Sequence, residues 1–224
     1  MQKLLSEYLV LLAEIDAWFN GCVESLGPAL ISCRAGCSSC CRGLFDITLL
    51  DARLLQEGES RLPQELQKQA RDRARRQLAE LQRRWPDFDH PYLLNHYPDE
   101  VWTEMPEEDM TPCALLGADG RCLVYEHRPL TCRLHGLPNI DLSGESFSDE
   151  WCTLNFIGSD PLPLQELRWR FRDRFSAEIE LFRKFSAKLI GEPVNELDTF
   201  IPTALLIDFN ASDWPEWWRR HKTA

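Results

Sequence analysis

Residues 33–41 read Cys-Arg-Ala-Gly-Cys-Ser-Ser-Cys-Cys and place four cysteines within nine residues. The spacings of two and three residues, with Gly36 and two serines between the thiols, suit a tight turn. Such a turn lets neighbouring sulfurs reach one ion without ordering a long loop. Thiolates are soft, anionic ligands that favour zinc, copper(I) and iron–sulfur clusters. The stretch therefore predicts a metal site.

Four further cysteines follow, and together with the first four they form the predicted ligand set. The set is Cys33, Cys37, Cys40, Cys41, Cys113, Cys122, Cys132 and Cys152. Cys40 and Cys41 are adjacent, and neighbouring side chains diverge in extended chain. Eight thiols divide into two groups of four, but the sequence leaves open whether there are one or two sites and which cysteines share one. It also leaves open whether the cofactor is zinc or an iron–sulfur cluster.

Composition narrows the compartment and the partners. Lys and Arg number 25 against 36 Asp and Glu, which gives a net charge of −11. Because phosphate contacts need cationic side chains, nucleic acid is not an expected partner. No stretch of apolar residues approaches the length that a membrane-spanning helix needs. Glu7, Glu14 and Asp16 flank the apolar residues of the N-terminus too closely for a signal peptide. We expect a cytoplasmic protein that binds a metal ion or cluster and no membrane, and a protein partner stays open.

Disulfides are the competing use of so many cysteines. The cytosol keeps thiols reduced, and nine is an odd number, so a disulfide framework would leave one cysteine unpaired. Metal binding is the favoured interpretation.

Helical periodicity surrounds the first cysteine stretch. Apolar residues at spacings of three and four predict a helix over residues 3–26, which Gly27-Pro28 ends. Cys22 lies on the apolar stripe of this helix and is expected in the core. Thr48, with Asp51 three residues on, predicts the start of a helix that ends near Gly58.

A basic helix is predicted from Pro63 to about Arg84, with a thin apolar stripe typical of a solvated surface. The next residues, 85–120, contain no Lys or Arg and many acids, and are expected to fold back against it as irregular chain. Residues 137–162 are expected to be loop, and 163–190 to form the strongest helix. The tryptophan-rich tail is expected to pack over the helices.

The predicted fold class is mainly α, a helical scaffold around an irregular, cysteine-rich core with few short strands. We expect one domain over residues 1–224. Its cysteine-cluster core covers about residues 30–155, flanked by the N-terminal helix 3–26 and C-terminal helices within 163–224.

The spacing of Cys33, Cys37 and Cys40 also matches that of radical S-adenosylmethionine enzymes. Those enzymes build a barrel of strand–helix units after the motif, whereas the sequence here continues with helical and acidic segments. Ser39 also stands where that superfamily often has an aromatic residue. The radical-enzyme interpretation is therefore disfavoured.

The second cysteine region carries a more specific pattern. It contains Pro112-Cys113, then Gly120-Arg121-Cys122, then Tyr125-Glu-His-Arg-Pro-Leu-Thr-Cys132-Arg133. Together with residues 33–41, this pattern resembles the YkgJ-like CxxCxxCC cysteine-cluster family over about residues 30–155. This chain has one extra residue between the first two cysteines.

The resemblance implies chelation of zinc or iron by the cysteines. The family is related to the cysteine domain of flagellin lysine N-methylase, which looks like an iron–sulfur-dependent methyl transferase. Three functions follow: a metal-binding protein, an iron–sulfur protein methyltransferase-like enzyme, and a zinc-stapled interaction module. Whether the chain is an enzyme stays open, because no nucleotide-binding or catalytic motif accompanies the cysteines.

Four other residues near the second region bear on the site. Arg128 and Arg133 either neutralise thiolates or bind an anion, or else fix a turn and pair with a nearby acid. His135 ranks below the cysteines as a ligand. Trp151, beside Cys152, either shields the site from water or belongs to the core.

Overall fold

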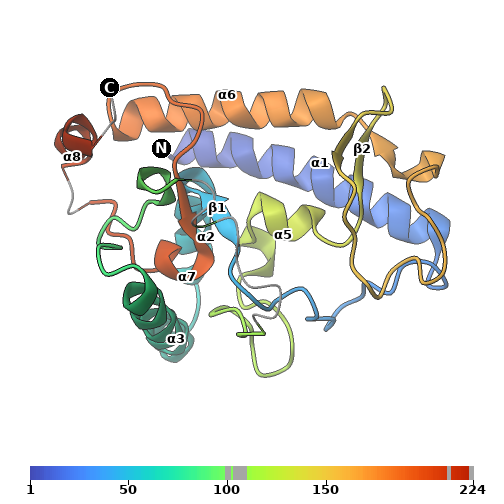
Figure 1. Cartoon of the computed structure of the whole chain (residues 1–224), viewed down its shortest axis with the longest axis horizontal. Coiled ribbons are helices and arrows are strands. Elements are labelled where there is room, and N and C mark those ends of the chain that lie inside the picture. Colours follow the sequence, from blue (N-terminus) through green and yellow to red (C-terminus); the bar gives the residue numbers. More distant parts are fainter. Residues whose placement is uncertain (99–101, 103–109, 211–212, 222–224) are drawn as a thin grey trace.

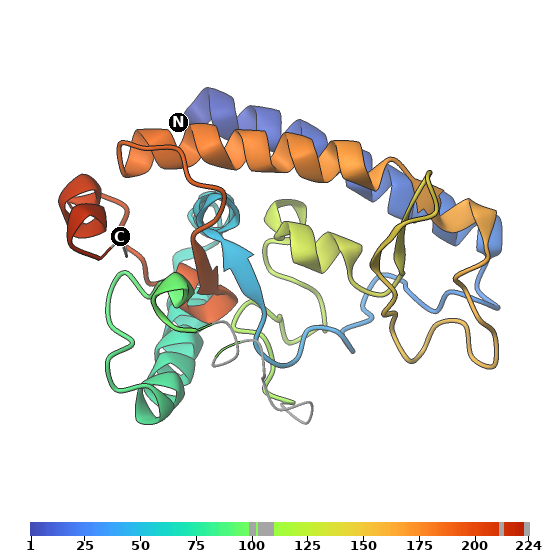
Figure 2. The same cartoon turned by 45° about the horizontal axis from the view of Figure 1, so that its top comes forward.

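The structure is a computed structural model that describes residues 1–98, 102, 110–210 and 213–221. Helices predominate, and the mainly α fold class is confirmed. The two longest apolar helices, α1 (Gln2–Leu26) and α6 (Phe171–Leu189), lie side by side along one side of the molecule (Figures 1 and 2). The cysteine loops lie on the opposite side, below the short helix α5 (Leu130–Leu134).

Helix α1 forms where the periodicity predicted it. Its apolar stripe buries Tyr8, Leu12 and Ile15 completely or almost so, which anchors the helix to the core. The helix ends at Gly27, whose φ of 74° a residue with a side chain rarely adopts. Cys22 is 2% exposed and donates its thiol hydrogen to the carbonyl of Glu166, so its core assignment is confirmed.

Helices α2 (Leu49–Glu59) and α3 (Gln64–Arg84) also follow the predicted boundaries. The Thr48 hydroxyl caps α2 by accepting a hydrogen bond from the Asp51 N–H at 3.2 Å, which satisfies one of the free amides of the first turn. Helix α3 buries only Ala70, Ala74, Leu78 and Leu81. The rest of α3 is polar and largely solvated, as its thin stripe predicted.

The strands are short, and two of the three pairings that the structure describes join segments that are far apart in the sequence. Strand β1 (Asp46–Thr48), which follows the first cysteine loop, pairs antiparallel with β5 (Asp198–Phe200). Strand β2 (Asn139–Asp141) pairs antiparallel with β3 (Ser146–Ser148) and parallel with β4 (Arg168–Trp169). The prediction that residues 137–162 are only loop is therefore wrong for the β2–β3 hairpin.

The prediction of a helix from residue 163 is also wrong at its start. A 3-10 turn, η3 (Gln165–Leu167), and β4 occupy the first part, and α6 begins at Phe171. Trp169 accepts a hydrogen bond from the Leu142 N–H at 3.0 Å and stacks on Trp18. These tertiary contacts override the helical spacing of Leu164 and Leu167.

The acidic stretch returns to α3, and within the described residues the two are joined by hydrogen bonds, including one from Gln82 to the Asp89 carboxylate at 3.1 Å. Arg73 donates to the carbonyl of Leu116 at 2.6 Å, and Gln77 donates to that of Pro112 at 2.8 Å. Arg71 pairs with Glu59 of α2, and the other ion pairs of α3 within the described structure are internal to it. Six of the acids that motivated the prediction, Asp99, Glu100, Glu104, Glu107, Glu108 and Asp109, lie outside the described residues.

The remaining elements are short helices and turns that pack against the longer helices and strands. The 3-10 turn η1 (Leu94–His96) contacts β5, and the 3-10 turn η2 (Tyr125–His127) contacts α2. The short helix α7 (Ile201–Ala204) contacts both α2 and α3. The tail forms α8 (Trp214–His221), and Trp214, Trp217 and Trp218 pack against the core as predicted. Within the described ranges, no helix is both long and apolar enough to cross a membrane.

Buried acids make the fold sensitive to pH. Burial raises the pKa of Asp198 to about 7, and the carboxylates of Glu196, Asp46 and Asp51 raise it further, against the lowering effect of a hydrogen bond from Asn95 at 2.9 Å. Between about pH 4 and pH 7 the folded protein holds a proton that the unfolded chain has lost. The free energy of unfolding therefore falls as the pH rises through this window.

We predict that Asp198→Asn stabilises the protein at pH 8 by on the order of 2–4 kcal/mol, and much less at pH 5. Asparagine keeps an oxygen that can accept from Asn95 but carries no charge to desolvate. Urea unfolding at the two pH values measures the difference. An equal effect at both would mean that the Asp198 carboxyl does not titrate in this range.

Candidate metal centre

The first cysteine stretch is an irregular loop made of two consecutive turns. The Cys37 N–H donates to the Arg34 carbonyl and the Cys41 N–H to the Ser38 carbonyl, each at 3.0 Å. Gly36 has a φ of 84°, which the first turn requires. The two turns keep the four cysteines of residues 33–41 within one compact loop.

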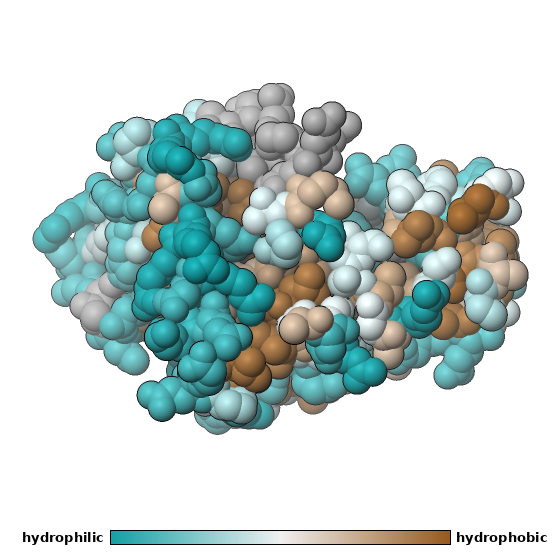
Figure 3. Space-filling view, turned by 90° about the horizontal axis from the view of Figure 1, so that it is seen from below, coloured by the Kyte–Doolittle hydropathy of each residue, from teal (hydrophilic) through white to brown (hydrophobic). Residues whose placement is uncertain are grey.

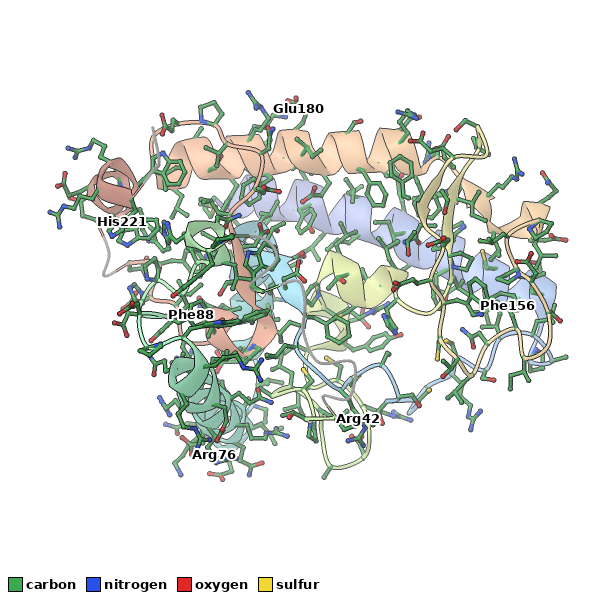
Figure 4. All side chains as sticks on the ribbon, viewed as in Figure 1. Arg42, Arg76, Phe88, Phe156, Glu180 and His221 are labelled. Carbon is green, nitrogen blue, oxygen red and sulfur yellow. The ribbon has the colours of Figure 1, made fainter. Side chains whose placement is uncertain are left out.

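Backbone pairing joins this loop to the second cysteine region. The Cys113 N–H donates to the Cys41 carbonyl at 2.9 Å, and the Gly43 N–H donates to the Thr111 carbonyl at 2.9 Å. Between these two bonds, Arg42 pairs with Pro112 in an isolated antiparallel β-bridge. Figure 4 labels Arg42 at the lower edge of the molecule. Two stretches about seventy residues apart in sequence are thereby held edge to edge.

The second region then folds back on itself. Leu116 pairs with Cys122, and the Leu123 N–H donates to the Leu115 carbonyl at 2.9 Å. Gly120, at the tip of this turn, touches the first loop, since a Cβ built there would lie 3.2 Å from the Gly36 carbonyl oxygen. The side of the molecule that carries both loops presents apolar and polar areas next to each other (Figure 3).

Four cysteines of the two regions form what we call the second thiol group: Cys41, Cys113, Cys122 and Cys132. Burial raises the pKa of Cys132 well above its usual value, and the negative charges of Cys113 and Cys122 raise it further. Burial likewise raises the pKa of Cys113, to about 11. Because each thiolate in the group repels the others, a cation placed among them would stabilise them all.

Three other cysteines form what we call the first thiol group: Cys33, Cys37 and Cys152. Burial raises the pKa of Cys33, a hydrogen bond from Asn155 lowers it, and the charges of Cys152, Cys37 and Cys40 raise it again. The Cys152 N–H donates to the Gly136 carbonyl at 3.3 Å, and a Cβ built on Gly136 would lie 3.5 Å from Cys33 Sγ, so both cysteines lie next to this glycine. The first group thus draws on both ends of the cysteine-rich core.

The charge of Cys40 acts on cysteines of both groups. Its charge raises the pKa of Cys33 in the first group and of Cys113 and Cys132 in the second. Its thiol also hydrogen-bonds to Cys41, which raises the pKa of Cys40 and lowers that of Cys41. The two adjacent thiols therefore lie close to each other and do not diverge as expected, and the charge of Cys40 acts on both groups.

The donor chemistry fits a thiophilic metal, although the side chains are not in a coordinating arrangement. All eight cysteines of the predicted ligand set are free thiols of intermediate exposure, whereas Cys22 is buried. No three His, Cys, Asp or Glu side chains within the described part of the chain are positioned to hold a metal ion. The eight ligand assignments therefore stay predictions.

Arg128 and Arg133 pair with an acid, which was the second of their two interpretations. Arg128 contacts Asp16 of α1 at 2.5 Å, and Arg133, whose side chain is 2% exposed, contacts the other oxygen of the same carboxylate. Arg133 also donates to the carbonyls of Arg128 and Glu126, at 3.0 and 2.8 Å. Both guanidinium groups still lower the pKa of Cys122, against the larger effect of its burial, so their charge reaches the second thiol group.

His135 and Trp151 lie against apolar neighbours. The His135 ring meets the Phe45 ring edge-on, with centroids 5.7 Å apart, and burial lowers its pKa. Trp151 is half-buried and packs against the main core. The structure also brings Asn155 to Cys33, and Asp16 to the two arginines that flank Cys132, which sequence reasoning missed because neither residue lies in a recognisable motif.

The chain belongs to the CxxCxxCC family, whose description reads "putative zinc- or iron-chelating domain". The match covers residues 32–153, more than half of the chain and all eight cysteines of the predicted set. No curated protein and no solved structure matches the chain.

We predict that Asp16→Asn destabilises the metal-free protein by about 3–5 kcal/mol, because it leaves the buried Arg133 without its counter-charge. Glu14→Gln is the matched control on the same helix. Glu14 pairs with Arg170 and Arg174, which are more exposed, so its loss should cost about 1 kcal/mol or less. Urea unfolding of both variants tests the difference, and equal losses would contradict it.

Proposed function

We propose that this protein is a metal-binding protein whose eight clustered cysteines hold zinc or an iron–sulfur cluster in two thiolate groups. The observation that carries the proposal is the backbone pairing of residues 41–43 with 111–113. It brings two cysteine regions together in a chain whose cysteines are all free thiols. Bound metal would supply the positive charge that such closely placed thiolates need.

Metal would also complete the link between the two regions. The loops that carry the cysteines have little regular structure and few large buried side chains of their own. A thiolate-bound ion can replace the hydrophobic contacts that such loops lack, and its binding energy is then folding energy. A structural or carrier role is therefore our first choice.

The enzyme and interaction-module alternatives depend on the coordination of the metal. Complete four-thiolate shells would favour a structural centre, and an open coordination position would favour an iron–sulfur-dependent, methyltransferase-like enzyme. Zinc and iron are separated by purifying the protein without oxygen and measuring zinc, iron and acid-labile sulfide. A preparation that contains none of these would overturn the proposal.

We predict that Cys122→Ser and Cys152→Ser each remove about half of the bound metal, since they lie in different thiol groups. Elemental analysis of the anaerobically purified variants measures the loss. If either variant loses all of the metal, or none of it, the division into two groups is wrong.

Cys22→Ala is the matched control, because it removes a thiol that belongs to neither group and is buried in the core. It should leave the metal content unchanged and cost only about 1 kcal/mol of stability, from lost packing. A lower metal content would show that Cys22 takes part in binding.

A further inference from the structure

Asn155 is a buried polar residue three positions after Cys152, and the residue as a whole is only 2% exposed. Phe156, its neighbour, is labelled in Figure 4 toward the end of the molecule where α1 ends. Burying a carboxamide is costly unless each of its polar atoms has a partner. The partners of Asn155 therefore indicate what holds it there.

The carboxamide joins three separate segments. Its Oδ1 accepts from the Ser32 N–H at 2.9 Å, and its Nδ2 donates to the Gly136 carbonyl at 2.7 Å. These two backbone partners fix which end of the amide is oxygen and which is nitrogen. In that orientation the second Nδ2 hydrogen points at Cys33, with Nδ2 and Sγ 3.5 Å apart.

Gly136 makes room for this arrangement. It has a φ of 110°, and a Cβ built on it would lie 3.5 Å from both Cys33 Sγ and Asn155 Nδ2 and 3.8 Å from Cys152 Cβ. Cys33, Cys152 and Asn155 therefore all lie around the position that a side chain at residue 136 would take. Further hydrogen bonds hold the segments in register: the Ser32 hydroxyl donates to the Leu154 carbonyl and the Phe156 N–H to the Leu30 carbonyl, each at 2.7 Å.

We propose that Asn155 is a positioning residue of the first thiol group, which holds the Cys33 thiolate toward Cys152 so that both bind the same metal. This inference rests on the proposed function. An N–H donor to a ligand sulfur orients it and disperses part of its charge, and the loss of such a partner typically costs about 10–100-fold in metal affinity. The second thiol group has no contact with Asn155 among the described interactions.

The test isolates each thiol group before Asn155 is changed. Cys122→Ser leaves the first group intact, and Cys152→Ser leaves the second. Each protein, with and without Asn155→Ala, is titrated with Co²⁺ under anaerobic conditions, and thiolate-to-cobalt charge-transfer absorption reports binding. Asn155→Ser, a smaller change that also removes the Nδ2 donor, is titrated in parallel.

We expect Asn155→Ala to weaken Co²⁺ binding about 10–100-fold in the Cys122→Ser protein and to leave the Cys152→Ser protein unchanged. Unchanged binding in the second case also shows that the variant is folded around the other group. Asn139→Ala is the control for loss of a buried asparagine, since Asn139 is 9% exposed and its Oδ1 has no hydrogen-bond partner among the residues that the structure describes. It should change neither titration.

Two results would overturn the inference. Equal Co²⁺ affinity with and without Asn155 in the Cys122→Ser protein would show that the amide does not position a ligand. Equal weakening in both proteins would show a general structural role. If the unsubstituted protein binds no Co²⁺, zinc or iron at all, the proposed function itself fails, which is a distinct outcome.

Discussion

Two carboxylates that are largely withdrawn from solvent hold the cysteine-rich core against the helical scaffold. Asp16 of α1 pairs with Arg128 and Arg133, on either side of the start of α5. Asp51 of α2 accepts from the Tyr8 hydroxyl at 2.8 Å and from the Leu130 N–H at 3.1 Å. Because α5 carries Cys132, these charges decide where the second thiol group meets the scaffold, and a buried charge without its partner is costly.

Whereas Asp16 attracts its arginines, the thiolates of the cysteines repel one another. Burial and mutual proximity raise the pKa of Cys33, Cys113 and Cys132, so the metal-free core disfavours its own thiolates. A cation would turn this repulsion into attraction, which couples metal binding to the closure of loops that have little packing of their own. The charge of the Cys40 thiol raises the pKa of cysteines in both thiol groups.

Membership of the CxxCxxCC family agrees with this account, because the match ends close to the last predicted ligand, Cys152. Asn155 lies just beyond the matched residues and contacts the first predicted ligand, Cys33. The scaffold helices α1 and α6 also lie outside the match. They supply part of the apolar core and Asp16, and so support a metal-binding region that they do not themselves form.

Local sequence alone determined the helices and the chemistry of the cysteines. Residues 2–26 and 64–84 are helical because their apolar residues repeat at helical spacing and Gly27 or Pro63 bounds them, and close thiol spacing predicts metal without any fold. Only the tertiary structure decided the β2–β3 hairpin, the strand at Arg168–Trp169 and the contact of Asn155 with Cys33. These features depend on contacts between residues far apart in the chain, such as Trp18 with Trp169 and Cys33 with Asn155, which no local pattern records.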